Sequence, residues 1–232
     1  MASPFTPKSL AFLRALKRHN DRDWFRERKA EYEQHVRGPM LEVISRLADD
    51  FSGFAPEIIS DPRVSLYRIY RDTRFSADKS PLKTNIAAHF PTRGFAKGEG
   101  AGLYFEVSPT GVWMGGGLYM PSSPQLLMLR EHIVLHQRRF ERVISAPALR
   151  KAVGEVRGER LTRVPRGFAT DHPAAEHLRL KQFLAGREYP AAFAVTPGFY
   201  RELLGVFRAI VPFIRFLNEA LPRGTEVPWR QS

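Results

Sequence analysis

Hydrophobic residues recur at helical spacing through residues 1–60, which predicts a helical N-terminal layer. Thr6-Pro7 suits the start of a first helix, and Asn20 is placed to cap a second one. Gly38-Pro39 predicts the end of that second helix, because proline does not continue a helix. A third, amphipathic helix is expected over residues 40–51.

Residues 61–120 change to short runs that are rich in β-branched and aromatic side chains, which is typical of strands. Residues 64–70 form the first of these runs. Three further strands are expected at residues 85–90, 103–108 and 112–119. The turn-forming sequence Pro109-Thr110-Gly111 separates the last two and favours an antiparallel hairpin.

Residues 121–232 have mostly helical periodicity, with one or two short strands. The expected elements are a long helix at 125–144, a short one at 148–153, a helix from His172-Pro173 to 183, a strand at 189–195, and a terminal helix from Thr196-Pro197. The most apolar stretch, residues 199–221, carries several charged side chains, so it is interpreted as a buried helix and no membrane partner is expected.

These patterns predict a single α+β domain over residues 1–232. We expect a mixed or antiparallel sheet with a helical N-terminal layer and packed C-terminal helices. The length is within the range that one core can serve, and 43% hydrophobic residues supply enough apolar surface for it.

Composition narrows the possible chemistry and the location of the protein. The chain has no cysteine, which excludes disulfides, thiolate metal sites and a cysteine nucleophile. The first residues lack a basic segment followed by an apolar run, so a secretory signal is not expected and a cytoplasmic location is predicted. Oligomeric state and cofactors are not determined by these observations.

A net charge of +12 is typical of proteins with polyanionic partners, so association with nucleic acid is one alternative. The basic residues are spread along the chain, however, and 28 of the 36 are arginine. A GC-rich genome produces that bias without any functional demand, and a dispersed pattern is also that of an ordinary solvated surface.

Residues 68–85 hold five cations and only two carboxylates, Asp72 and Asp78. A buried guanidinium is costly unless it is paired and hydrogen-bonded, and these carboxylates are the nearest partners in sequence. Three positive charges remain in excess, which a bound anion would neutralise. The predicted ligand-binding residues are Arg68, Arg71, Arg74, Lys79, Lys83 and Asn85. A purely structural salt-bridge network is the other interpretation of the same residues.

Candidates for catalysis or metal binding are weaker. Asp72, Asp78 and His172 are the possible proton-transfer groups, although His172 before Pro173 is more typical of a helix cap. The histidines at 89, 132, 136, 172 and 177 do not have zinc-site spacing, so no metal is expected. Residues 115–117 are three glycines without a dinucleotide-binding pattern, and they favour a strand bulge over a ligand contact.

The charged segment resembles the signature of the domain of unknown function 2461 family. The matching residues are Arg68, Arg71, Asp72, Arg74, Phe75, Asp78, Lys79, Pro81, Lys83 and Asn85. Leu82 stands where the family usually has tyrosine, which would alter binding if that hydroxyl contacts a ligand. Residues 20–32, 115–117 and 167–173 look similar to the family too. The family has no established function, so the resemblance implies membership and no activity.

Three functions therefore remain open. The first is a cytoplasmic protein that binds a small phosphorylated or carboxylated ligand through residues 68–85, with or without a reaction. The second is a nucleic-acid-associated protein that uses its general basic surface. The third is an interaction scaffold in which the charged segment is only a structural lock.

Overall fold

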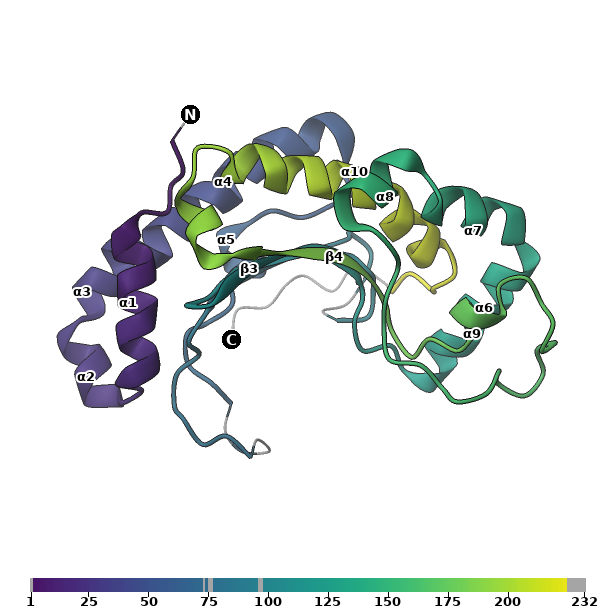
Figure 1. The fold of residues 1–232 in the computed structure, drawn as a ribbon, viewed down its shortest axis with the longest axis horizontal. Helices are drawn as coiled ribbons and strands as arrows, with labels where there is room; N and C mark the ends of the chain where they lie inside the picture. Colours follow the sequence, from purple (N-terminus) through teal and green to yellow (C-terminus); the bar gives the residue numbers. More distant parts are fainter. Residues whose placement is uncertain (1, 73, 75–76, 96–97, 225–232) are drawn as a thin grey trace. The chain divides into compact units, whose positions relative to one another are not determined.

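The computed structural model describes residues 2–72, 74, 77–95 and 98–224, and it contains a four-stranded antiparallel sheet (Figure 1). The strands pair in chain order as β1 (Ile86–Pro91), β2 (Gly102–Val107), β3 (Gly111–Leu118) and β4 (Phe183–Pro190). Helices precede and follow the sheet, so the α+β class predicted from the sequence is confirmed.

The chain forms two compact units, which we describe separately. Unit 1 comprises the described residues of 1–90, 104–114 and 188–204, and unit 2 comprises those of 91–103, 115–187 and 205–232. Each strand of the sheet begins in one unit and ends in the other, as does the long helix α10 (Phe199–Glu219).

Unit 1 contains the N-terminal helical layer. Its helices are α1 (Pro7–Arg18), α2 (Arg22–Glu27), α3 (Lys29–Tyr32), a π-helical turn (Glu33–Arg37), α4 (Gly38–Phe54) and α5 (Pro62–Ser65). The expected start after Thr6 is confirmed, and the backbone N–H of Thr6 donates to Ser9 Oγ at 2.9 Å. Such a contact satisfies one of the free donors that every helix start exposes.

Two predictions about helix boundaries in this layer are wrong. The second helix is capped by Asp21, whose side chain accepts from the backbone N–H of Asp23 and Trp24 at 2.8 and 2.9 Å, and Asn20 has a different role described below. Gly38-Pro39 begins α4 instead of ending a helix. Proline fits there because the first turn of a helix needs no backbone N–H donor.

The strand predicted at residues 64–70 is also wrong in part. Its first residues belong to α5, which Asp61 caps by accepting from Arg63 N at 2.7 Å. The remaining residues are extended but form only isolated antiparallel bridges, Leu66 with Ala88 and Tyr70 with Leu82. β-branched and aromatic side chains favour extended backbone, but whether a full ladder forms depends on the partner chain.

Aromatic side chains form the core of unit 1 on one face of the sheet. Phe51 of α4 packs against Phe90 of β1 with ring centroids 5.6 Å apart. Phe90 stacks on Phe105 of β2, and Phe105 contacts Phe199 in the first turn of α10, each at 6.1 Å. Helices α4 and α10 therefore cover this face within unit 1, as Figure 1 shows for the helices drawn above the strands.

Unit 2 contains the other helices: α6 (Ser123–Leu135), α7 (Gln137–Ile144), α8 (Pro147–Val153), α9 (Ala175–Leu178) and the second part of α10. The single helix expected at 125–144 is interrupted at His136, which has a non-helical backbone. The helix expected from His172 to residue 183 is only the four-residue α9, and Phe183 already begins β4. The strand expected at 189–195 ends at Pro190, and the chain then forms a 3-10 helix, Ala191–Val195, which belongs to unit 1.

Gly116 and Gly117 of β3 lie in unit 2 and allow neighbouring strands to approach closely. A Cβ on Gly117 would lie 1.9 Å from the carbonyl oxygen of Phe183, and one on Gly116 would lie 2.6 Å from that of Gly102. Gly117 also has a φ of 139°, a backbone conformation that residues other than glycine rarely adopt. These contacts give the glycines a structural role, as the strand interpretation of the sequence predicts.

Candidate functional site

The charged segment lies in unit 1 as two extended arms joined by a loop. Arg71 N donates to Pro81 O at 2.9 Å and Lys83 N donates to Ile69 O at 2.8 Å, so the arms pair in antiparallel fashion. The described part of the loop between them can be followed in Figure 1 as the blue chain that leaves the strands. Phe75, one of the motif positions, lies outside the described residues.

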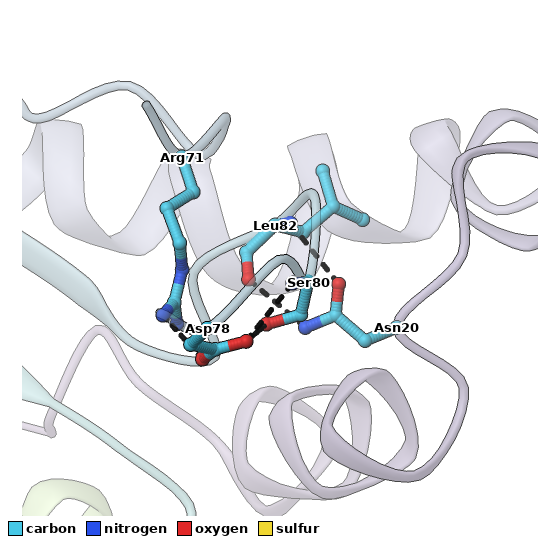
Figure 2. A network of polar contacts seen from close by, with 5 residues as sticks. All are labelled: Asn20, Arg71, Asp78, Ser80 and Leu82. Atoms are coloured by element: carbon cyan, nitrogen blue, oxygen red, sulfur yellow. Dashed lines mark hydrogen bonds and ion pairs between the residues drawn. The ribbon is translucent and has the colours of Figure 1, made fainter. Parts of the chain in front are cut away.

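Arg71 and Asp78 form an ion pair that closes this loop (Figure 2). The other carboxylate oxygen of Asp78 accepts from the hydroxyl and the backbone N–H of Ser80, the latter at 2.9 Å. The Ser80 hydrogen bonds, together with the Arg71 charge, hold the pKa of Asp78 below its usual value. Arg71 Nε is buried and has no hydrogen-bond partner among the described residues, so Asp78 does not use the full donor capacity of this guanidinium.

Arg74 and Asp72 form the second ion pair, and it lies at the surface. Arg74 donates through Nη2 and Nε to the two oxygens of Asp72 at 2.8 and 3.1 Å, and its side chain is 76% exposed. The side-chain and backbone hydrogen bonds from Arg74 lower the pKa of Asp72 to about 2. Both carboxylates of the segment are thus engaged by arginines of the same segment.

Asn20 anchors the loop to the N-terminal helices. Its Nδ2 donates to Leu82 O at 2.9 Å and its Oδ1 accepts from Leu82 N at 3.0 Å (Figure 2). The Leu82 side chain is fully buried, so position 82 contributes its backbone to polar contacts and its side chain to the core of unit 1. In this chain the residue that replaces the family's usual tyrosine is therefore a core residue.

Lys83 and Asn85 extend the segment to the sheet face opposite the aromatic core of unit 1. Lys83 Nζ lies 4.8 Å from the ring centroid of Tyr67, a cation–π distance. Asn85 Nδ2 donates to Glu106 Oε2, and Tyr104 Oη donates to the same oxygen at 2.6 Å. Glu106 and Tyr104 of β2 point to one side because alternate residues of a strand share a face.

Arg68 and Lys79 complete the predicted set of ligand-binding residues. Both side chains are exposed, and the charge of Arg68 contributes to lowering the pKa of Asp72. The cations are therefore held differently: Arg71 and Arg74 by carboxylates, Lys83 by an aromatic ring, and Arg68 and Lys79 at exposed positions.

The three candidates for proton transfer, Asp72, Asp78 and His172, each make structural contacts that account for their presence without catalysis. Asp72 and Asp78 have lowered pKa values because of the hydrogen bonds described above, and a carboxylate that binds protons less readily is a poorer general base at neutral pH. His172 belongs to unit 2, and its Nδ1 accepts from Ala174 N at 3.1 Å. The cap position expected for His172 before Pro173 is wrong, because α9 begins only at Ala175 and its N-cap is Ala174; the His172 contact belongs to the turn that precedes the helix.

The part of the chain that the structure describes contains no group of three or more His, Asp or Glu side chains arranged to hold a metal ion. No helix of that part is both long and apolar enough to cross a membrane.

Sequence reasoning missed Asn20 and Glu106 as partners of the charged segment, and Tyr104 as the residue that shares the Glu106 oxygen with Asn85. Strand alternation predicts that Tyr104 and Glu106 share a face, and this signal was present in the sequence. The pairing of Asn20 with Leu82 spans 62 positions of the chain and has no local signal.

Comparison with known proteins identifies the family of this chain. The family model described as "Conserved hypothetical protein (DUF2461)" matches residues 8–216 of the 232-residue chain. The chain belongs to the DUF2461 family. The match includes the whole charged segment, which confirms the family resemblance found from the motif. No curated protein and no solved structure matches the chain. Membership in DUF2461 therefore identifies the family without assigning an activity.

Proposed function

We propose that this protein binds a small anionic ligand, such as a phosphorylated or carboxylated metabolite, at the charged segment of unit 1. The observation that carries the proposal is the excess of positive charge in residues 68–85, where five cations accompany two carboxylates. Both carboxylates are already engaged, Asp78 by Arg71 and Asp72 by Arg74. An anion would neutralise the remaining charge through charge-assisted hydrogen bonds, which are stronger than those between neutral groups.

The alternative of a purely structural lock explains the two ion pairs within the segment, and it would have to stabilise the other cations through groups outside the segment. Like charges held close together destabilise a fold, so an excess of cations within one short segment favours a bound anion. Arg71 supports a binding role further, because its buried Nε has no partner among the described residues. Buried donors in native proteins are nearly always satisfied, by protein, water or ligand.

The proposal is for binding, and it includes no reaction. We also place this binding in the cytoplasm, since a chain without cysteine gains nothing from an oxidising compartment.

A thermal-shift screen of the purified protein tests the proposal. Phosphate, pyrophosphate, sugar phosphates, nucleotides and dicarboxylates are each added in excess, because a ligand that binds only the folded state raises the melting temperature. The affinity of any hit is then compared in Lys83→Met and Lys151→Met variants. Both remove one lysine charge, but Lys83 belongs to the charged segment whereas Lys151 is an exposed residue of α8 in unit 2.

We expect Lys83→Met to weaken binding about tenfold or more, the loss typical of one charged hydrogen bond, and Lys151→Met to leave it unchanged. Methionine preserves much of the aliphatic part of the Lys83 side chain, so the variant tests the charge that lies over Tyr67 more than the packing. The proposal is rejected if no anion shifts the melting temperature, or if both variants weaken binding equally.

A further inference from the structure

Three aromatic rings lie on the sheet face of unit 1 opposite the aromatic core: Tyr67, Tyr104 of β2 and Trp113 of β3. Tyr104 lies between the buried residues Leu103 and Phe105, and Trp113 lies between the buried residues Val112 and Met114. Strand alternation therefore turns both rings away from the core. All three rings are half-buried, so part of each remains accessible in the described structure.

These rings are continuous with the charged segment. The centroids of Tyr67 and Tyr104 are 6.2 Å apart, and those of Tyr104 and Trp113 are 5.6 Å apart. Lys83 Nζ lies 4.8 Å from the Tyr67 centroid at one end of this row. A cation of the segment, three rings and the Glu106 carboxylate bound to Tyr104 thus form one connected surface within unit 1.

Polar atoms on this surface have unused hydrogen-bonding capacity. Both hydrogen bonds that Glu106 receives, from Tyr104 Oη and Asn85 Nδ2, end on Oε2. Oε1 of Glu106 receives none from any described residue, and neither the indole N–H of Trp113 nor Oδ1 of Asn85 has a partner there. A carboxylate can accept about four hydrogen bonds in all, so Glu106 is held in a fixed orientation with one oxygen still available.

A structural role alone does not account for this arrangement. Half-buried carboxylates that only stabilise a fold are normally paired with a cation, and here the donors from described residues are a neutral phenol and a neutral amide. Neutral donors orient the Glu106 carboxylate but do not neutralise its negative charge, so the carboxylate can still bind a further hydrogen-bond donor. An aromatic ring beside such a carboxylate is the combination that binds sugars, since the ring packs on the C–H face of the sugar and the carboxylate accepts from its hydroxyls.

We propose that this surface binds the sugar ring of a phosphorylated ligand, with a vicinal diol hydrogen-bonded to Glu106 and the ring packed on Tyr104 and Trp113. The inference rests on the proposed function, because the phosphate group of the same ligand would be held by the charged segment beside Lys83. A carboxylate that accepts from a ribose hydroxyl is a known solution in nucleotide-binding folds. The proposed ligand is a phosphate ester of a sugar ring that carries a vicinal diol, and both a free sugar phosphate and a ribonucleotide meet this description.

Isothermal titration calorimetry of the full chain tests this with five probes: inorganic phosphate, ribose 5-phosphate, ribose, AMP and dAMP. AMP and dAMP differ only in the hydroxyl that completes the vicinal diol. We expect ribose 5-phosphate, AMP or both to bind at least about tenfold more tightly than phosphate, and dAMP to bind about tenfold more weakly than AMP, as for the loss of one hydrogen bond to a charged group. Comparison of AMP with ribose 5-phosphate separates the nucleotide from the sugar phosphate.

The variant Glu106→Gln tests the role of the carboxylate. Glutamine keeps an oxygen that can accept from Tyr104 and Asn85 but removes the charge, so we expect the preference for the diol to disappear while inorganic phosphate binds at least as tightly as before, because a nearby negative charge is lost. Trp113→Phe provides a second test that retains an aromatic ring in the fold. It should remove the change in tryptophan fluorescence that AMP or ribose 5-phosphate causes in the wild-type protein.

The outcomes separate this inference from the proposed function. If phosphate and its sugar esters bind equally well and all depend on Lys83, the anion site stands and the sugar site is rejected. If ribose alone binds and loses affinity in Glu106→Gln, while no probe depends on Lys83, the sugar surface stands without the anion site. If none of the five probes binds, the sugar site is rejected, and the anion site is rejected with it when no anion of the thermal-shift screen binds either.

Discussion

Asn20 contributes to stability through its own side chain, because it satisfies both the N–H and the C=O of Leu82. The Leu82 side chain is fully buried, so water has limited access to this peptide unit. We expect Asn20→Ala to lower the free energy of unfolding by about 1–3 kcal/mol, the cost of leaving partly buried polar groups unsatisfied. Urea unfolding measures this as a lower midpoint with an unchanged m-value.

Arg26→Ala is the matched control for Asn20→Ala. Arg26 forms an ion pair with Asp23, and both side chains are more than 70% exposed. Exposed pairs contribute about 1 kcal/mol or less. If the two variants lose the same stability, Asn20 does not anchor the charged loop in the way that the hydrogen bonds indicate.

His132 makes the stability of unit 2 sensitive to pH. Burial, with a smaller contribution from the charge of the neighbouring His136, lowers its pKa below the ordinary 6.5, and its buried Nε2 has no hydrogen-bond partner among the described residues. As the pH falls below 6.5, the unfolded chain therefore takes up this proton before the folded chain does. We expect the contribution of neutral His132 to the free energy of unfolding to be complete above pH 6.5 and to decrease as the pH falls toward the lowered pKa.

Urea unfolding at pH 7.5, 6.5 and 5.5 checks this expectation in the wild type and in His132→Leu. The variant should lose less stability between pH 6.5 and 5.5 than the wild type. Burial lowers the pKa of His177 as well, so a smaller dependence should remain in the single variant and decrease further in His132→Leu/His177→Leu. Equal pH dependence in all three proteins would contradict the assignment.

At the scale of elements, the pairing of β3 with β4 in unit 2 depends on a single glycine. Gly117 has a φ of 139°, and a Cβ there would lie 1.9 Å from Phe183 O of β4. We expect Gly117→Ala to reduce the free energy of unfolding by roughly 3 kcal/mol or more, since the backbone strain and the clash with a neighbouring strand both oppose the native conformation. Chemical denaturation or the yield of folded protein measures the effect.

Gly205→Ala is the opposite case. Gly205 lies inside α10, and apart from the neighbouring residues and backbone of its own helix no atom lies within 4 Å of the position that a Cβ would take. Alanine should stabilise the helix by about 0.5–1 kcal/mol relative to glycine. A gain from Gly117→Ala, or an equal loss from both substitutions, would disagree with the strand geometry.

For the whole molecule, the net charge of +12 predicts general attraction to polyanions in addition to any specific site. Arg142, Arg163 and Arg166 are exposed residues of unit 2 that lie outside the charged segment. We expect their simultaneous replacement by glutamine to weaken binding of a short single-stranded oligonucleotide and to reduce its salt dependence by roughly two in the log–log slope. The affinity for a phosphate ester bound at residues 68–85 should not change beyond a small long-range effect, because salt screens distant charges.

Fluorescence anisotropy with a labelled oligonucleotide at several salt concentrations provides the first measurement, and calorimetry with the phosphate ester provides the second. If the triple variant weakens both ligands to the same extent, the anion is attracted by the total charge of the protein. That result would favour the nucleic-acid alternative over a defined site.

The sequence by itself determined the α+β class, three of the four strands and the membership in DUF2461. These properties follow from local patterns: the alternation of apolar and polar residues, helical periodicity and a dense charged motif. Each pattern involves residues that are close together in sequence, so it can be recognised without the structure. The same local patterns failed in part at residues 64–70 and at residues 172–195, because the pairing partner decides whether a segment joins a full strand ladder.

Only the tertiary structure decided which residues surround the charged segment. Asn20 reaches Leu82 across 62 positions, and Asn85 reaches Glu106 across 21. Such contacts exist because helices and strands pack against one another, and side-chain spacing along the chain does not encode which distant residue will be the partner. The motif located the place to look, but the neutral donors around Glu106 and the adjacent rings became apparent only when the strands were placed side by side.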